Sequence, residues 1–449
     1  MDFINKGKIG FVSISHPDYL EPMVFEASEQ AALAVEQAGF ELVRIKDPVT
    51  NWQTAQSAGT KLAARDLSGA VLFLASWVEC PVFMSVLREI EHIPICVWGF
   101  PMHESNGALC STGSYVSFAM LKGSLDRLEL PYVYIADHPK SENAHKILSD
   151  FCAAAACRLS MRRSRVGLVG YTSMGIYPGT FDHLLMRAII GPEVEHIDTY
   201  TLIRLAEQTS EKEKSEIVGE YRAHARIKPD VSEEMLKKSA GLYAAAKALA
   251  EEKGLAAVNI KCQYELSKEY KMVPCVPLAL LAENGIVASC EGDVPNTVSM
   301  LILHYLCGKT VAYGDAINRS GERVLFSSCG FLPFSLGEKG EQTIGNFLPH
   351  PGFTGIQNSF VMRPGRVTLL RLVETRGGYK LLYFTGEGKK TQLRQGYMPA
   401  LEVLIDGGAA KAEKLEANYA GQHYAICHGD ISGQIRAYAR IMKIEAVCI

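Results

Sequence analysis

Residues 9–15, IGFVSIS, begin a series of short apolar runs that alternate with stretches of helical character as far as about residue 160. The later apolar runs are FELVRI (40–45), GAVLFLAS (69–76), PICVWGF (94–100) and PYVYIAD (131–137). Short continuous apolar runs separated by helices are typical of parallel strands that are buried on both faces of a sheet. The first part of the chain is therefore predicted to be a doubly wound α/β domain.

A second alternation of strands and helices follows the basic stretch MRRSR at 161–165. Its predicted strands are VGLVGY (166–171), AAVNIKC (256–262) and IVASCEGD (286–293). The charged stretch 211–238 predicts two solvated helices between the first two of these strands. The second of these helices is expected to begin near Ser232, a favourable N-cap, and to end at Gly254, where glycine can adopt the left-handed cap.

After about residue 306 the chain changes to short β-type runs with little helix between them. These runs are TVAYGD (310–315), RVLFSSCG (323–330), NSFVMR (358–363), RVTLLRLVE (366–374), YKLLYFTGE (379–387) and MPALEVLIDG (398–407). Such a series indicates an antiparallel barrel or sandwich, closed by a last helix near 432–442. We therefore expect an α/β protein with two Rossmann-like α/β domains, at 1–163 and 164–292, and a β-rich, barrel-like domain at 293–449.

The composition favours a small-molecule partner. The 449 residues include 46 Lys and Arg against 49 Asp and Glu, a formal net charge of −3, so the basic field that nucleic-acid binders need is missing. No apolar run reaches the roughly 18 residues of a membrane span. The 12 cysteines are scattered in a chain whose size needs no disulfides, which is consistent with a reducing cytoplasm.

Three carboxylates follow predicted strands of the second domain. Glu265 lies in KCQYEL (261–266), and Glu291 and Asp293 lie in CEGDVPNTVSM (290–300). Open α/β sheets bind their ligands at the carboxyl ends of the strands, so these side chains could converge, share a divalent cation and transfer protons. The alternative is that Asp293 only caps the helix that follows and that the glutamates are solvated.

Two histidines, His423 and His428, lie in QHYAICHGD ahead of the predicted last helix. One imidazole beside oxygen ligands would complete a mixed site that suits Mn²⁺ or a similar ion, whereas structural zinc sites prefer Cys and His ligands at close spacing. A single loop histidine is more often ordinary polar surface. Cys262, Cys275 and Cys290 are interpreted as buried small hydrophobes rather than ligands.

Other catalytic motifs are weak. The chain has no GxGxxG arrangement and no GxSxG elbow, and GEGKKT at 386–391 lacks the first glycine of a phosphate-binding loop. Cys329 remains an alternative nucleophile, although the sequence shows no paired base. Trp98 in VWGFP and Ser114 in STGSY could line a sugar site at the end of a strand, or could be ordinary loop residues.

Taken together, these segments resemble the L-fucose/L-arabinose isomerase family of metal-dependent aldose–ketose isomerases. The resemblance rests on KC-x-x-EL, on CEGDV with a methionine six residues later, and on a C-terminal histidine followed by Gly, Asp and a closing helix. VWG, GSYV, the YGD ending at Asp315, the SCG ending at Gly330 and FVMRPGRVTLLRL extend it over nearly the whole chain. In two respects the chain departs from the family: SCG, with Ser328, replaces the HCG of many relatives, and the chain is shorter than the L-fucose enzymes.

The resemblance implies a Mn²⁺-dependent isomerase that converts an aldose to its 2-ketose through an enediol, with a hexose, deoxyhexose or sulfonated hexose as substrate. Other divalent cations are possible. It implies Glu265, Asp293 and His423 as metal ligands, with Glu291 as the second choice to Asp293, and Glu265 and Asp293 as the groups that exchange protons. It also implies a cytoplasmic homo-oligomer, commonly a hexamer, with active sites near subunit boundaries.

Two other functions remain open at this point. A non-catalytic cytoplasmic sugar-binding or regulatory protein would use the two α/β lobes but would need neither the β-rich domain nor clustered carboxylates. A metal-dependent sugar epimerase or lyase would share the enediolate intermediate and differ in its product.

Overall fold

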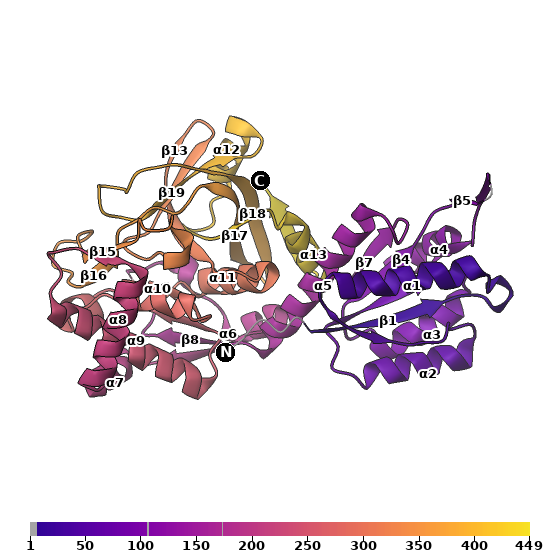
Figure 1. Cartoon of the computed structure of the whole chain (residues 1–449), viewed down its shortest axis with the longest axis horizontal. Coiled ribbons are helices and arrows are strands. Elements are labelled where there is room, and N and C mark those ends of the chain that lie inside the picture. The colour runs from indigo at the N-terminus through magenta and orange to yellow at the C-terminus, as the bar shows by residue number, and fades with distance from the viewer. Residues whose placement is uncertain (1–6, 106, 173) are drawn as a thin grey trace. The chain divides into compact units, whose positions relative to one another are not determined.

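The computed structural model describes residues 7–105, 107–172 and 174–449 (Figure 1). Their backbone contacts divide the chain into two compact units. Of the described residues, 7–160 and 433–444 form the N-terminal unit, and 161–432 and 445–449 form the C-terminal unit. Among the described residues, no helix is both long and apolar enough to cross a bilayer. All twelve cysteines lie in the described ranges, and each is a free thiol.

A five-stranded parallel sheet forms the centre of the N-terminal unit, in the order β2-β1-β3-β4-β7. Its strands are β1 (Lys8–Ile14), β2 (Glu41–Arg44), β3 (Gly69–Leu74), β4 (Ile95–Gly99) and β7 (Tyr132–Ala136). The five strands expected in this region are confirmed. A small hairpin, β5 (His103–Ser105) with β6 (Ala108–Cys110), follows β4.

Helices cover both faces of this sheet, which explains why its strands are continuously apolar. They are α1 (Pro22–Gln37), α2 (Trp52–Ala63), α3 (Cys80–Ile90), α4 (Ser114–Arg127) and α5 (Glu142–Arg163). Phe83 of α3 and Phe118 of α4 pack in one core with Val12 and Leu72 of the sheet. Figure 1 shows α1 on one side of β1 and α2 and α3 on the other.

The last helix, α13 (Ser432–Met442), packs elsewhere than the sequence predicts. It was expected to close the β-rich domain, but its residues from 433 onward belong to the N-terminal unit. There Arg440 donates from Nε to the carbonyl of Tyr132 at 2.5 Å and lies over the rings of Tyr132 and Tyr134. These contacts with β7 show why the helix packs against the first sheet.

The C-terminal unit contains a second parallel sheet, in the order β12-β11-β8-β9. Its strands are β8 (Arg165–Val169), β9 (Glu193–Ile197), β11 (Ala257–Ile260) and β12 (Val287–Cys290). Its helices include α6 (His183–Leu185), α7 (Thr199–Gln208), α8 (Glu211–His224), α9 (Glu233–Lys253), α10 (Cys275–Glu283) and α11 (Val294–Cys307). The predicted ends of α9 are confirmed, because Ser232 accepts a hydrogen bond from the Met235 amide and Gly254 has a φ of 61°.

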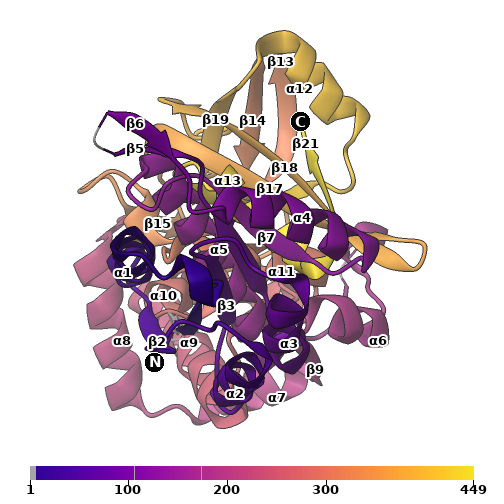
Figure 2. The same cartoon turned by 90° about the vertical axis from the view of Figure 1, so that its right-hand side faces the viewer.

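The β-rich part forms a closed barrel, with strands in the order β17-β20-β13-β14-β19-β18 and a further pairing of β18 with β17 (Figure 2). The strands are β13 (Ala312–Ser320), β14 (Arg323–Ser327), β17 (Gly365–Thr375), β18 (Gly378–Lys389), β19 (Ala400–Ile405) and β20 (His423–His428). The final strand β21 (Glu445–Cys448) pairs in parallel with β18, and α12 (Gly408–Ala417) follows β19. The rings of Phe326, Phe384 and Tyr424 pack against one another within 6.1 Å.

One predicted barrel strand is absent from the barrel. Of the segment 358–363, only Asn358 is in a strand, β16 (Ile356–Asn358), which belongs to a small separate sheet with β15 (Thr343–Asn346) and β10 (Arg226–Ile227). Phe360 instead stacks with Phe334, and the Met362 amide donates to the carbonyl of Ala400. Side-chain packing against neighbouring loops therefore replaces strand pairing in this segment.

The turn between β12 and α11 depends on a glycine that the structure makes hard to replace. Gly292 has a φ of 71°, and a Cβ there would lie 2.4 Å from the backbone oxygen of Tyr171. Gly308, at the other end of α11, has a similar φ of 65°, but a Cβ there would have no described atom within 4 Å. The two glycines thus share a left-handed backbone, which would be strained for alanine, and differ in the clash that a Cβ would meet.

We therefore expect Gly292→Ala to destabilise the C-terminal unit more than Gly308→Ala. The control should cost about 1–2 kcal/mol for its left-handed backbone, and Gly292→Ala about 2 kcal/mol more for the clash with Tyr171. Thermal melts of the two variants beside the parent protein measure the difference. Equal melting temperatures for the two variants would contradict this account of the turn.

Candidate active site

His423 lies among three carboxylates where the barrel faces the carboxyl ends of β11 and β12. Its Nδ1 is 2.8 Å from Oδ2 of Asp293, and its Nε2 is 3.3 Å from Oδ1 of Asp315 and 3.4 Å from Oε2 of Glu291. The imidazole is fully buried. Burial alone would lower the pKa of His423, but the polar contacts with Asp293, Asp315 and Glu291 raise that pKa well above its usual value.

Strained turns present the acidic side chains of this region. Glu291 directly follows β12 and has a φ of 70°, and Tyr264, directly before Glu265, has a φ of 62°. A left-handed backbone costs energy for residues other than glycine and occurs preferentially at functional sites. The two loops that follow β11 and β12 therefore both carry this mark of a functional region.

Both carboxylate oxygens of Asp293 are engaged by donors of the protein itself. Oδ1 accepts the Asn296 amide at 3.0 Å, so the residue does cap α11. Oδ2 accepts Nη1 of Arg371 at 2.6 Å as well as Nδ1 of His423. Burial would raise the pKa of Asp293, but the charge of Arg371 and the hydrogen bond from His423 lower it to about 2. In this geometry Asp293 orients His423.

Arg371 was not singled out from the sequence, although it is central to the site. It lies in the buried strand β17 with a side chain that is 1 % exposed. Besides Asp293, its guanidinium donates to the carbonyl of Pro178 at 2.7 Å and to that of His423 at 3.3 Å. An arginine inside the apolar run RVTLLRLVE was the available signal, because a charged residue in a buried strand needs a buried partner.

Glu265 is held by a lysine four residues earlier. Nζ of Lys261 lies 2.8 Å from Oε1 and 2.6 Å from Oε2 of Glu265, and also sits 3.7 Å from the ring centre of Tyr171. The Lys261 side chain is fully buried, whereas that of Glu265 is 42 % exposed. Burial would raise the pKa of Glu265, but the hydrogen bond from Lys261, a backbone hydrogen bond and the charge of Lys261 together lower that pKa. The side chain is thus a fixed, ionised carboxylate.

A second set of donor atoms shares Glu291. The thiols of Cys262 and Cys290 and a carboxylate oxygen of Glu291 all lie within 4.8 Å of one another. The Cys290 thiol is also 2.8 Å from the hydroxyl of Tyr313. These residues line a small pocket with a free volume of about 20 Å³, which is enough for a water molecule or an ion. Glu291 therefore belongs to two groups of possible ligand atoms: one with the imidazole of His423, and one with the thiols of Cys262 and Cys290.

Of the remaining candidates, Cys329 lines the same small pocket as Cys262, Cys290 and Glu291, whereas His428 is not among the residues that line it. His428 is half-buried, and its Nε2 is 3.1 Å from the carbonyl of Arg363. The Cys329 thiol is 3.5 Å from Nε2 of His350, a neighbour that the sequence did not reveal. Burial raises the pKa of Cys329, which keeps it a protonated thiol and disfavours a nucleophilic role.

Trp98 and Ser114 lie in the N-terminal unit and are buried in it. Trp98 is 0 % exposed, and its indole nitrogen donates to the carbonyl of Asp137 at 2.9 Å. The Ser114 hydroxyl donates to the carbonyl of Leu74 and accepts the Phe100 amide. As placed, both support the end of the first sheet, and neither presents a polar group to solvent.

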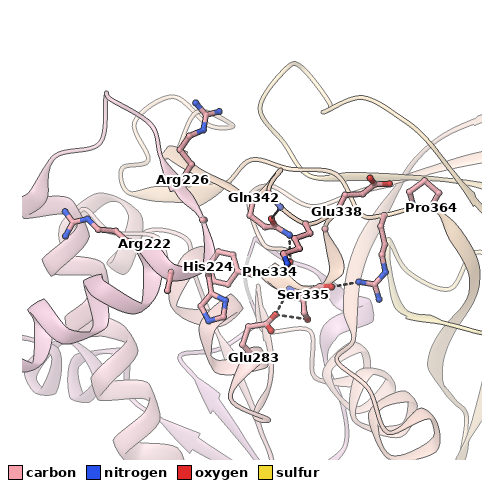
Figure 3. A pocket seen from close by; sticks show the side chains of 15 residues that line it. Arg222, His224, Arg226, Glu283, Phe334, Ser335, Glu338, Gln342 and Pro364 are labelled. Atoms are coloured by element: carbon pink, nitrogen blue, oxygen red, sulfur yellow. Dashed lines mark hydrogen bonds between the residues drawn. The ribbon is translucent and has the colours of Figure 1, made fainter.

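A pocket much larger than the one beside Glu291 lies elsewhere in the C-terminal unit. Figure 3 shows this open groove of about 1020 Å³, lined by Arg222, His224, Phe334 and Glu283 among others. Its arginines are exposed, and Arg222 already pairs with Glu233. Among the described residues of the groove, no three acidic, histidine or cysteine side chains lie close enough together to hold a metal ion. The candidate site is therefore identified by its chemistry rather than by its size.

The buried pair of Asp293 and Arg371 predicts a large stability effect. Asp293→Ala would leave the guanidinium buried without its partner, a loss of about 3–5 kcal/mol. Glu416→Ala is the matched control, because it removes a largely exposed partner of Arg319 and should cost at most about 1 kcal/mol. Urea denaturation of the two variants tests this, and a similar small loss in both would show that the buried pair does not hold the site together.

Comparison with known proteins identifies relatives that match this chain along most of its length. No family model matches the chain. A sulfoquinovose isomerase of Alkalicoccus urumqiensis is 24 % identical over 81 % of this chain and 82 % of its own. That of Priestia megaterium is 22 % identical over 81 % of each chain, and that of a Clostridium species is 22 % identical over 82 % of this chain and 80 % of its own.

Among solved structures, a solute-binding protein from Agrobacterium vitis bound with α-D-tagatopyranose is 12 % identical over 68 % of this chain and 90 % of its own, with a TM-score of 0.19. A TM-score this low does not support any inference about this chain. The isomerase relatives, by contrast, match about four fifths of both chains, and they indicate that this protein is an enzyme, an aldose–ketose isomerase.

Proposed function

We propose that the protein is a divalent-metal-dependent isomerase that converts a sulfonated hexose from its aldose to its 2-ketose form. The sulfoquinovose isomerase relatives supply the substrate class. The main support for a metal ion is the environment of Nε2 of His423. This atom is buried, lacks a well-directed hydrogen bond among the described residues and faces the carboxylates of Glu291 and Asp315. Buried polar atoms are rarely left unpaired, and each such atom in a native site calls for an explanation.

The donor set fits a hard or borderline divalent cation. An imidazole nitrogen beside carboxylate oxygens suits Mn²⁺, our expected ion, whereas the neighbouring thiols of Cys262 and Cys290 would suit softer ions such as Zn²⁺. Glu291 and His423 are the first residues we expect to hold the cation. Asp293, the first choice from the family resemblance, instead has both oxygens occupied by Asn296, Arg371 and His423, which favours the second choice, Glu291.

The chain's own residues have distinct parts in the proposed reaction. A cation at this position would polarise the oxygens on C1 and C2 of the sugar and so acidify the proton on C2. Glu265, ionised and fixed by Lys261, is the proposed base that takes the C2 proton and returns it to C1 through an enediol, while the hydroxyl proton of O2 passes to O1. Asp293 holds Nδ1 of His423, so that Nε2 is directed at the carboxylates.

Turnover in D₂O tests this function. With Mn²⁺ and sulfoquinovose, proton NMR should show ketose signals, and deuterium at the exchanged carbon would support proton transfer. Dialysis against EDTA should abolish turnover, and added Mn²⁺ should restore it. An aldose epimer or a cleaved product would instead indicate an epimerase or a lyase, and full activity after metal removal would contradict the metal's role.

Substitution of the acidic residues tests their assignment. Glu291→Gln and Glu265→Gln should each lower kcat/KM by at least about 100-fold, because one removes a metal ligand and the other the base. Glu322→Gln, on the exposed turn between β13 and β14, is the control and should retain parental activity. Full activity of the double variant Glu265→Gln, Asp293→Asn would disprove the proposed roles of both residues.

A further inference from the structure

The register of the barrel aligns the candidate site with a row of residues that leads away from it. His423 of β20 is paired with Asp315 of β13, Asp315 with Ser327 of β14, and Ser327 with Ala400 of β19. Residues that pair directly across antiparallel strands point to the same face. Tyr424 and Phe326 are the chain neighbours of His423 and Ser327 and therefore point to the opposite face of the sheet. Their rings pack together inside the barrel, so the row from His423 to Ser327 lies on its outer face.

Arg394 is fixed at the far end of this row. Its Nε donates to the hydroxyl of Ser327 at 2.9 Å, and Ser327 in turn donates to the carbonyl of Pro399 at 2.6 Å. Two backbone hydrogen bonds of 3.0 Å, made with Met398, hold the main chain of Arg394 in a tight loop. The guanidinium is therefore positioned by the barrel rather than free on a flexible side chain.

The terminal nitrogens of this guanidinium have no acidic partner in the described part of the chain. Arg323 and Arg366, on the neighbouring strands, pair with Glu402 and Asp406 respectively. Among the described residues no carboxylate lies within ion-pair distance of half-buried Arg394, and the hydrogen bond that its side chain makes to Ser327 uses Nε. A positioned guanidinium with two free nitrogens is suited to bidentate binding of an oxyanion such as sulfonate or phosphate.

The spacing matches the length of a six-carbon sugar. Ser327 is two strand positions from His423, roughly 10 Å at the usual spacing of adjacent strands. The carbon chain of an extended hexose spans about 6 Å from C1 to C6 at ordinary C–C bond lengths, and a group on C6 adds a further ~2 Å. A sugar with C1 and C2 at His423 and Glu291 would thus bring an oxyanion on C6 to the nitrogens of Arg394.

From this we infer that Arg394, held by Ser327, is the residue that selects sugars with an anionic group on the carbon farthest from the reacting end. The inference rests on the proposed function and extends it, because it assigns the residue that binds the anionic group of the substrate. Arg394 contacts only the distal group and takes no part in proton transfer between C1 and C2.

Kinetics with three sugars that differ only at C6 test this assignment. The sugars are sulfoquinovose, glucose 6-phosphate and glucose, with a sulfonate, a phosphate and a hydroxyl group at C6. Arg394→Met should lower kcat/KM for the preferred anionic sugar by roughly 10- to 100-fold, mainly by raising KM. For glucose, kcat/KM of this variant should stay within about 3-fold of the parent value. The parent enzyme's preference between sulfonate and phosphate identifies which oxyanion the site takes.

Two further variants separate recognition from structure. Arg394→Lys keeps the positive charge but not the two parallel donors of the guanidinium, and Ser327→Ala removes the hydroxyl that holds the guanidinium. Both variants should therefore lose kcat/KM for the anionic sugar, but less than Arg394→Met does. Arg376→Met, in the exposed turn between β17 and β18, is the matched control and should leave all three sugars unchanged. Melting temperatures near that of the parent protein would show that the variants are folded.

The outcomes distinguish this inference from the proposed function. If the parent enzyme isomerises none of the sugars, the proposed function fails. If it isomerises them and Arg394→Met affects charged and neutral sugars equally, the assignment of Arg394 fails alone. If glucose is too poor a substrate, methanesulfonate serves as the probe: it should inhibit the parent enzyme competitively and Arg394→Met at least about 10-fold more weakly, and equal inhibition of both would overturn the assignment.

Discussion

The buried contact of Asp293 with Arg371 and His423 is the interaction on which the rest of the site depends. Its three members come from the start of α11, from β17 and from β20, which are far apart in the sequence. All three side chains are at most 1 % exposed. Each of these charges would be costly to bury alone, so the contact is stable only when the parallel sheet of the C-terminal unit and the barrel are correctly assembled. Assembly of the fold and orientation of His423 are therefore one event.

Two kinds of backbone constraint complete the arrangement. The left-handed turn at Glu291 and Gly292 lets one short loop present Glu291 toward Nε2 of His423 while Asp293 approaches Nδ1. The barrel supplies the second constraint, because strand pairing alternates aromatic residues such as Tyr424 inside with polar residues such as Asp315 outside. A one-residue slip of β20 would exchange these faces and remove His423 from the carboxylates.

Features set by local sequence could be predicted well. Ser232 and Gly254 mark the ends of α9 because capping depends on neighbouring backbone groups, and the apolar runs mark the buried strands. Asp293 was correctly expected to precede a helix, and it caps that helix. The contacts of Arg371, Asp315 and Lys261 could not be predicted, since they depend on strand register and packing between distant segments. The destination of α13 depends in the same way on tertiary contacts, here with β7.

The charge balance of the cluster links its stability to its proposed chemistry. When His423 is neutral, the carboxylates of Asp293, Glu291 and Asp315 face the single guanidinium of Arg371, which leaves an excess of negative charge in a largely buried site. The carboxylates raise the pKa of His423, so a proton on the imidazole would offset part of this excess. A divalent cation would relieve it more completely and would require the neutral imidazole. The same residues that favour a proton on the metal-free cluster would therefore favour the cation that we propose there, and Arg394 has no part in that charge balance.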